Sequence, residues 1–258
     1  TEDGLSRLRG SKYVQSEVND SFSNVRSMLM DGRPVLFSGT PCQVAGLGKF
    51  LGKDYDNLLK VDIACYGVPS PMVWARYLKE VQDNAGGSRI TGISFRDKSG
   101  GWKDYGMKIW FEDGSLFSRR HSEDPFMNSF LDGTDMRPSC YDCPARCGSS
   151  GSDITLGDFW GIGTVDSSLD DDTGTSLVIT YTEKGENAIR DTGCALHPES
   201  LEEARRFNAG VAASSASGTP HRDFFFLAMR HLGFSQAMGI AYSRNPAIRL
   251  IRRIYRTR

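Results

Sequence analysis

Residues 34–42 read PVLFSGTPC, an apolar run that ends in a Gly-Thr-Pro turn before a cysteine. The apolar part, 34–37, predicts a short buried strand, and the helical spacing of apolar residues over 44–51 predicts a helix with one buried face. A second apolar run, 58–65, predicts another strand. Because a strand, a helix and a strand follow one another in this order, we expect a parallel βαβ unit.

The same periodicities predict the remaining elements. Further helices are expected over 16–32, 70–81, 183–192, 199–208 and 222–238, and further strands over 89–96, 105–111, 116–117, 154–159 and 177–182. The turn Glu112-Asp113-Gly114-Ser115 is typical of an antiparallel hairpin, whereas 134–152 has no periodicity and is expected to be a loop. The sequence therefore predicts an α/β fold, with a mixed sheet around a parallel βαβ core, an antiparallel hairpin and a helical C-terminal part.

This order of elements also suggests a division of the chain into domains. We expect an α/β domain over 1–198, followed by a helical C-terminal extension over 199–258. The small residues of 212–218 are the best candidate for a linker.

Composition excludes some classes of function. Charged residues make up 24% of the chain and the formal net charge is −1, so nothing draws the protein toward nucleic acid or a membrane surface. No segment approaches the ~18 consecutive apolar residues that a membrane span requires. The start, Thr1-Glu2-Asp3-Gly4, has neither an initiator Met nor a signal-peptide pattern, and we expect a cut fragment in a cytoplasmic setting.

Cysteines carry the strongest chemical signal. The chain has 6 of them: Cys42, Cys65, Cys140, Cys143, Cys147 and Cys194. A disulfide framework is typical of short secreted chains, so metal or redox chemistry is the better expectation here. Cys42 and Cys65 each follow a predicted parallel strand, at the sheet edge where open α/β sheets bind ligands. Cys140 and Cys143 form a C-x-x-C pair that can grip one metal ion or cluster, so four thiolates could converge.

Three states of these thiols stay open: an iron–sulfur cluster, a structural zinc ion, or no ligand. Zinc sites usually come as two local pairs, whereas two ligands here would come singly from strand ends, which favours the cluster. Cys147 is either a spare thiol or a replacement for one of the four. Cys194 stands apart and is expected to be a small buried apolar residue.

Six blocks in order along the chain carry a family resemblance. They are Gly10–Ser16 (GSKYVQS), Ser38–Gln43 (SGTPCQ), Cys65–Pro71 (CYGVPSP), Ser94–Lys98 with Gly101-Trp102, Ser139–Cys143 (SCYDC) and Asp153–Gly161 (DITLGDFWG). With these blocks the chain resembles the beta subunit of coenzyme F420 hydrogenases and dehydrogenases. After Cys143 the family pattern is Phe-Lys-Gly followed by an arginine, whereas this chain continues Pro144-Ala145-Arg146-Cys147, which leaves the fourth ligand open.

The resemblance implies a flavoprotein with a 4Fe–4S cluster, both bound by the α/β domain over 1–198. The implied cluster ligands are Cys42, Cys65, Cys140 and Cys143. The implied FAD site is lined by Ser11, Lys12, Tyr13, Thr40, Gln43, Asp158 and Trp160. Relatives pass electrons between a deazaflavin or another hydride carrier, FAD and the cluster, so we expect a cytoplasmic oxidoreductase.

The resemblance also implies the kind of partner. The expected partners are a hydride-carrying coenzyme and a redox partner protein or ferredoxin-like domain, with no nucleic acid and no membrane span. The alternative is a non-catalytic adaptor subunit that carries a cluster or zinc. Flavin in the purified protein would separate the two functions.

Overall fold

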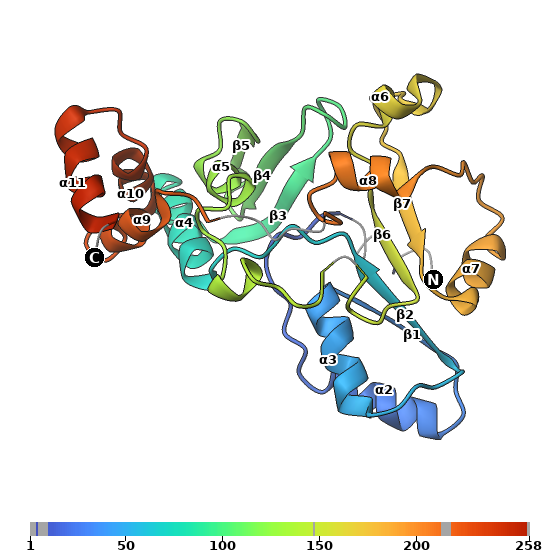
Figure 1. Cartoon of the computed structure of the whole chain (residues 1–258). Coiled ribbons are helices and arrows are strands. Elements are labelled where there is room, and N and C mark those ends of the chain that lie inside the picture. Colours follow the sequence, from blue (N-terminus) through green and yellow to red (C-terminus); the bar gives the residue numbers. More distant parts are fainter. Residues whose placement is uncertain (1–3, 5–9, 147, 213–217, 257–258) are drawn as a thin grey trace. The chain divides into compact units, whose positions relative to one another are not determined.

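The computed structural model describes residues 4, 10–146, 148–212 and 218–256, and it divides into two compact units (Figure 1). Unit 1 consists of Thr1–Gln15, Val68–Pro138 and Ser217–Arg258, and unit 2 consists of Ser16–Gly67 and Ser139–Ala216. Each unit is therefore built from stretches that lie far apart in the sequence. The linear boundary expected at residue 198 stays a prediction, and most of the expected linker lies outside the described residues.

Unit 2 is built on a four-stranded sheet. Its strands, in the order β1-β2-β6-β7, are β1 (Val35–Gly39), β2 (Leu58–Ile63), β6 (Ile154–Asp158) and β7 (Ser176–Thr180). The first three strands are parallel, and β7 runs antiparallel to β6. This arrangement confirms the predicted mixed sheet with a parallel βαβ core.

The helices of unit 2 bury their apolar faces against this sheet. They are α2 (Ser21–Met30), α3 (Pro41–Leu51), α6 (Ile162–Val165), α7 (Glu183–Arg190) and α8 (Leu201–Phe207), with short 3-10 turns at η1 (Pro138–Cys140) and η2 (Ser167–Leu169). Figure 1 shows α2 and α3 beside β1 and β2, where Val25, Leu29, Leu47 and Leu58 form a buried cluster. Burying each of these side chains contributes about 1.5–3 kcal/mol.

Unit 1 carries the antiparallel sheet. Its strands β3 (Ile90–Asp97), β4 (Gly106–Phe111) and β5 (Leu116–Arg120) pair in that order. The β4–β5 hairpin turns where the sequence predicted, with Gly114 at a φ of 84°, a left-handed conformation that favours glycine. The sheet thus confirms the expected hairpin.

The helices of unit 1 are α4 (Pro71–Asn84), α5 (Pro125–Leu131), α9 (Arg222–Ala228), α10 (Phe234–Ala241) and α11 (Pro246–Arg256). The single helix predicted over 222–238 is wrong as a continuous element, because the chain turns after α9 and Gly233 begins α10 in an extended conformation. The break lets both helices bury aromatic rings: Phe225 and Phe234 are fully buried, with ring centroids 6.0 Å apart.

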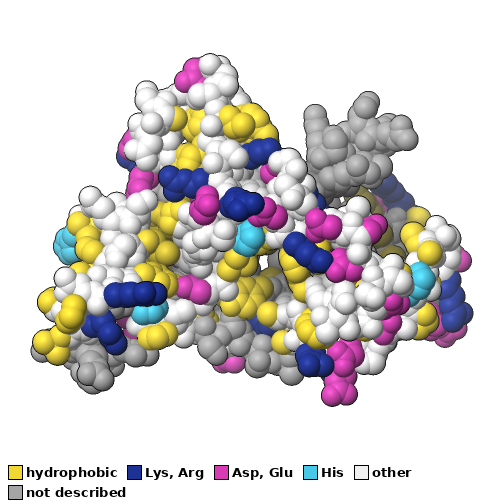
Figure 2. Space-filling model, turned by 90° about the horizontal axis from the view of Figure 1, so that it is seen from above, with side chains coloured by type: hydrophobic (Ala, Val, Ile, Leu, Met, Phe, Trp, Pro, Cys, Tyr) yellow, Lys and Arg dark blue, Asp and Glu magenta, His cyan; other side chains and the backbone are white. Residues whose placement is uncertain are grey.

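Two further predictions concern the surface and the membrane. Figure 2 shows basic and acidic side chains interspersed over the viewed face, in keeping with the balanced composition. Among the residues that the structure describes, no helix has the length and apolar character to cross a membrane.

Candidate functional site

The carboxyl ends of three parallel strands meet at one edge of the unit 2 sheet. β1 ends at Gly39, β2 at Ile63 and β6 at Asp158. Cys42 follows the first strand and Cys65 the second. The N–H of Ala64 donates to the carbonyl oxygen of Leu156 at 2.7 Å, so the segment that leads to Cys65 runs beside β6.

Cys42 occupies the first turn of α3, directly after Pro41. Its Sγ lies 3.2 Å from Oγ1 of Thr40, and the thiol is exposed. Gln43 fastens this helix start, because its Oε1 accepts from the Thr40 N–H at 2.9 Å and its Nε2 donates to Oγ of Ser16 at 3.0 Å. The expected helix start at Ser16 is therefore wrong: Ser16 bonds to Gln43, and α2 begins at Ser21.

Cys65 is partly buried, and it is the described cysteine whose pKa departs most clearly from its ordinary value. Burial, followed by repulsion from charge on Cys140, Cys42 and Cys143, raises the pKa of the Cys65 thiol to about 12. Electrostatic repulsion falls off with distance, so the three other sulfurs lie close to Cys65. These four residues, here called the thiol cluster, come from both stretches of unit 2: Cys42 and Cys65 from Ser16–Gly67, and Cys140 and Cys143 from Ser139–Ala216.

Arg146 ties the two stretches together. Its side chain is only 7% exposed, and it follows the C-x-x-C pair by three residues. Nη2 donates to the carbonyl oxygen of Ala209 at 2.6 Å, and Nη1 donates to that of Tyr66, the residue after Cys65, at 3.4 Å. Arg146 was not among the residues predicted from the sequence. The one feature that could have indicated it is that a basic residue lies between Cys143 and Cys147.

Glycines let the chain pack closely around Cys65. A Cβ on Gly210 would lie 2.8 Å from the carbonyl carbon of Ala64 and 3.0 Å from the N of Cys65. On the neighbouring strand, a Cβ on Gly157 would lie 2.6 Å from the Cβ of Ala64. The backbone before Cys65 thus packs between two glycines, which fixes the position of the Cys65 backbone.

The donor set limits which metal centres these residues could hold. Across residues 10–146, 148–212 and 218–256, no three His, Cys, Asp or Glu side chains are grouped tightly enough to hold a single metal ion. A zinc ion, with Zn–S bonds of about 2.3 Å, needs its sulfurs about 4 Å apart. A four-iron cluster binds each thiolate to a different iron and spaces the sulfurs more widely. Four thiols are donors that both centres accept, so the residues present fit a cluster as well as zinc.

Four of the expected flavin residues lie at the same sheet edge as the thiol cluster. Thr40 and Gln43 lie at the start of α3, Asp158 is the last residue of β6, and Trp160 lies two residues further on. The carbonyl oxygen of Asp158 accepts from Nδ2 of Asn208 at 2.6 Å and from the N–H of Trp160 at 3.1 Å. The strand end is therefore fixed by its backbone, with Asp158 and Trp160 placed at the edge.

The other expected flavin residues, Ser11, Lys12 and Tyr13, belong to unit 1. The exposed Lys12 donates through Nζ to the carbonyl oxygen of Gly10 at 3.1 Å. Tyr13 packs its ring against Phe95 and Phe130, with centroids 5.8 and 4.8 Å away. Within its own unit Tyr13 therefore has a packing role.

Two cysteines stand outside the thiol cluster. Cys194 is exposed, so the expectation that it is buried is wrong; it follows the end of α7 in a segment with little packing around it. Cys147 lies outside the described residues, and its relation to the cluster stays a prediction.

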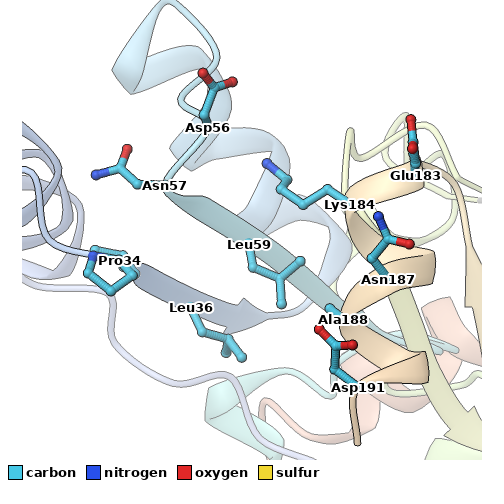
Figure 3. A pocket seen from close by; sticks show the side chains of 11 residues that line it. Pro34, Leu36, Asp56, Asn57, Leu59, Glu183, Lys184, Asn187, Ala188 and Asp191 are labelled. Atoms are coloured by element: carbon cyan, nitrogen blue, oxygen red, sulfur yellow. The ribbon is translucent and has the colours of Figure 1, made fainter.

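A pocket of about 750 Å³ lies elsewhere in unit 2 (Figure 3). Leu36 and Leu59 come from the beginnings of β1 and β2, and Ala188 and Asp191 come from α7 and the residue after it. These residues lie toward the amino ends of the strands, whereas the cysteines follow the carboxyl ends. The pocket therefore contains none of the predicted site residues.

Comparison with known proteins bears on this site directly. Residues 32–199 match the family model for the C terminus of the coenzyme F420 hydrogenase/dehydrogenase beta subunit. The chain belongs to this family. The match includes all four residues of the thiol cluster and confirms the resemblance seen in the sequence. No match was found among curated proteins. Membership of the F420 hydrogenase/dehydrogenase beta-subunit family indicates a redox role.

Proposed function

We propose that this chain is a cytoplasmic iron–sulfur flavoprotein that passes electrons between a hydride carrier such as coenzyme F420, FAD and a 4Fe–4S cluster. The observation that carries the proposal is the thiol cluster itself. Cys42, Cys65, Cys140 and Cys143 come together beside the carboxyl ends of parallel strands, where open α/β sheets bind ligands.

These thiols are suited to hold a cluster. A bound 4Fe–4S cluster would supply one-electron chemistry, and each ligating sulfur must give up its proton. Because burial raises the pKa of Cys65 to about 12, this thiol stays protonated at neutral pH until a metal displaces the proton. Cys42 is exposed at the start of α3, so its sulfur is accessible to a cluster.

Most of the residues proposed for FAD binding lie in unit 2. Thr40, Gln43, Asp158 and Trp160 share the sheet edge with the thiol cluster, and Trp160 would offer a flat wall for the isoalloxazine ring. The exposed Lys12 in its Ser11-Lys12-Tyr13 segment would pair with phosphate or with anionic reduced flavin. Electrons would leave to a redox partner protein or a ferredoxin-like domain.

Anaerobic purification with iron, sulfide, zinc and flavin quantification tests the proposal. We expect iron and sulfide in equal amounts, and flavin released when the protein is denatured. Zinc without sulfide would contradict the cluster. Iron and sulfide without flavin would instead favour an adaptor subunit.

Cys140→Ser tests one ligand of the thiol cluster. We expect this variant to lose most of its iron and visible absorbance while its far-ultraviolet circular dichroism stays close to that of the wild type. Cys194→Ser, at an exposed cysteine outside the thiol cluster, is the matched control and should keep its iron. Full iron and colour in C140S would remove Cys140 from the ligand set.

A further inference from the structure

Arg146 is a buried cation without a buried anion. It is 7% exposed, and its described contacts are with the carbonyl oxygens of Ala209 and Tyr66. Its Nε makes no hydrogen bond within the described part of the chain, and no carboxylate there pairs with its guanidinium. The fold therefore encloses a full positive charge and supplies only neutral oxygens to it.

An enclosed guanidinium needs compensation. Arginine does not lose its proton in proteins, so it cannot escape burial by becoming neutral. A buried charge left without a counter-charge is strongly unfavourable. An anion near Arg146 is therefore expected in the working protein.

The position of Arg146 identifies that anion. It lies in the loop that follows Cys143, and Nη1 reaches the carbonyl oxygen of the residue after Cys65. Four thiolates around an iron–sulfur core form a negatively charged centre, and that centre becomes more negative on reduction. The thiol cluster, once ligated, would thus supply the missing charge.

We propose that Arg146 is a positioning residue and the counter-charge of the cluster, an inference that rests on the proposed function. Its contact with Tyr66 joins the loop after Cys143 to the Cys65 segment, and its contact with Ala209 anchors the guanidinium. Because those contacts are neutral, its positive charge remains available to stabilise the reduced cluster. Arg146 thereby raises the reduction potential of the cluster.

Substitution separates the two roles. Arg146→Gln removes the charge and keeps one donor group, whereas Arg146→Lys keeps the charge and loses the two-armed contact. We expect R146Q to shift the reduction potential to a more negative value and to lose iron to a chelator several-fold faster than the wild type. R146K should keep a potential close to that of the wild type and also lose iron faster.

The control is Arg190→Gln, which removes a positive charge from an exposed arginine on α7 of the same unit. Its potential and iron retention should equal those of the wild type. The measurements are a spectroelectrochemical titration and the rate of iron release, and neither needs enzymatic turnover.

The outcomes separate this inference from the proposed function. If the wild type holds an iron–sulfur cluster and R146Q has the same reduction potential, the role of Arg146 is overturned. The proposed cluster is not affected by that result. If R146Q holds no cluster, the R146K potential decides, and a marked negative shift there would overturn the counter-charge. A wild type without any cluster would overturn both.

Discussion

Asp135 shows at the scale of one residue how burial changes a side chain. The carboxyl group is fully buried in unit 1, its Oδ2 accepts from Oγ of Ser129 at 2.7 Å, and its Oδ1 makes no hydrogen bond within the described residues. Burial, aided by the negative charge of Asp132, raises the pKa of Asp135 to about 7. At neutral pH this side chain is therefore divided between its neutral and charged forms.

The raised pKa makes stability depend on pH. An unfolded aspartate titrates near pH ~4, so between about pH 4 and 7 the folded state holds a proton that the unfolded state releases. The resulting stabilisation is complete below about pH 4 and is lost as the pH rises through about 7. We expect the free energy of unfolding to fall more steeply from about pH 4 to about pH 7 in the wild type than in Asp135→Asn.

Urea unfolding of both proteins at several pH values checks this prediction. The amide of D135N has nearly the volume of the carboxylic acid, so the comparison isolates the titration of one group. If the two stability curves ran parallel over this range, the pKa of Asp135 would be the same in the folded and unfolded states. The burial of its carboxyl group would then be contradicted.

At the scale of elements, the end of β2 is placed by its neighbours. Ala64 bonds to the backbone of β6, and Gly210 approaches Ala64 and Cys65 too closely for any side chain. The nearest atoms that a Cβ would meet belong to the backbone and cannot swing away. This packing fixes the Cys65 segment before any metal is bound.

Gly210→Ala tests this packing. We expect it to lower the free energy of unfolding by about 1–3 kcal/mol and to reduce the iron content, because the Cys65 segment must move. Gly239→Ala on the exposed side of α10 is the matched control: nothing lies within 4 Å of its added Cβ, so it should stabilise the protein by about 0.5–1 kcal/mol. Full stability and iron content in G210A would show that the segment can shift freely.

The elements differ in how well the sequence predicts them. β1, α3 and β2 follow the predicted ranges because local periodicity and the Gly-Thr-Pro turn agree with the tertiary structure. The start of α2 and the break between α9 and α10 were missed, since both depend on distant partners: Gln43 bonds Ser16, and two aromatic helices pack on one core. The periodicity of a local segment does not show which distant residues will pack against it.

The candidate site shows the same division. The spacing of Cys140 and Cys143 and the strand ends before Cys42 and Cys65 could be read from the sequence, because parallel strands place their carboxyl ends together. Arg146 and Gly210 could not be selected in this way. Their importance comes from burial and close approach, which appear only once the chain has folded.

At the scale of the whole molecule, both units are discontinuous in sequence, and the thiol cluster joins the two stretches of unit 2. A ligand that binds only the folded state stabilises that state, and a cluster that links distant stretches stabilises their arrangement in particular. The stability provided by a bound cluster should therefore be local to unit 2.

Hydrogen–deuterium exchange with and without the cluster tests this localisation. Anaerobic removal of iron should speed amide exchange in the segments around Cys42, Cys65 and Cys140–Cys143, because these stretches lose their common link. Exchange in the antiparallel sheet β3–β5 of unit 1 should stay unchanged, since no residue of the thiol cluster belongs to that unit. Equal acceleration in both units would show that the cluster supports the whole chain cooperatively. Unchanged exchange around the cysteines would show that Gly210, Arg146 and Gln43 hold the site by themselves.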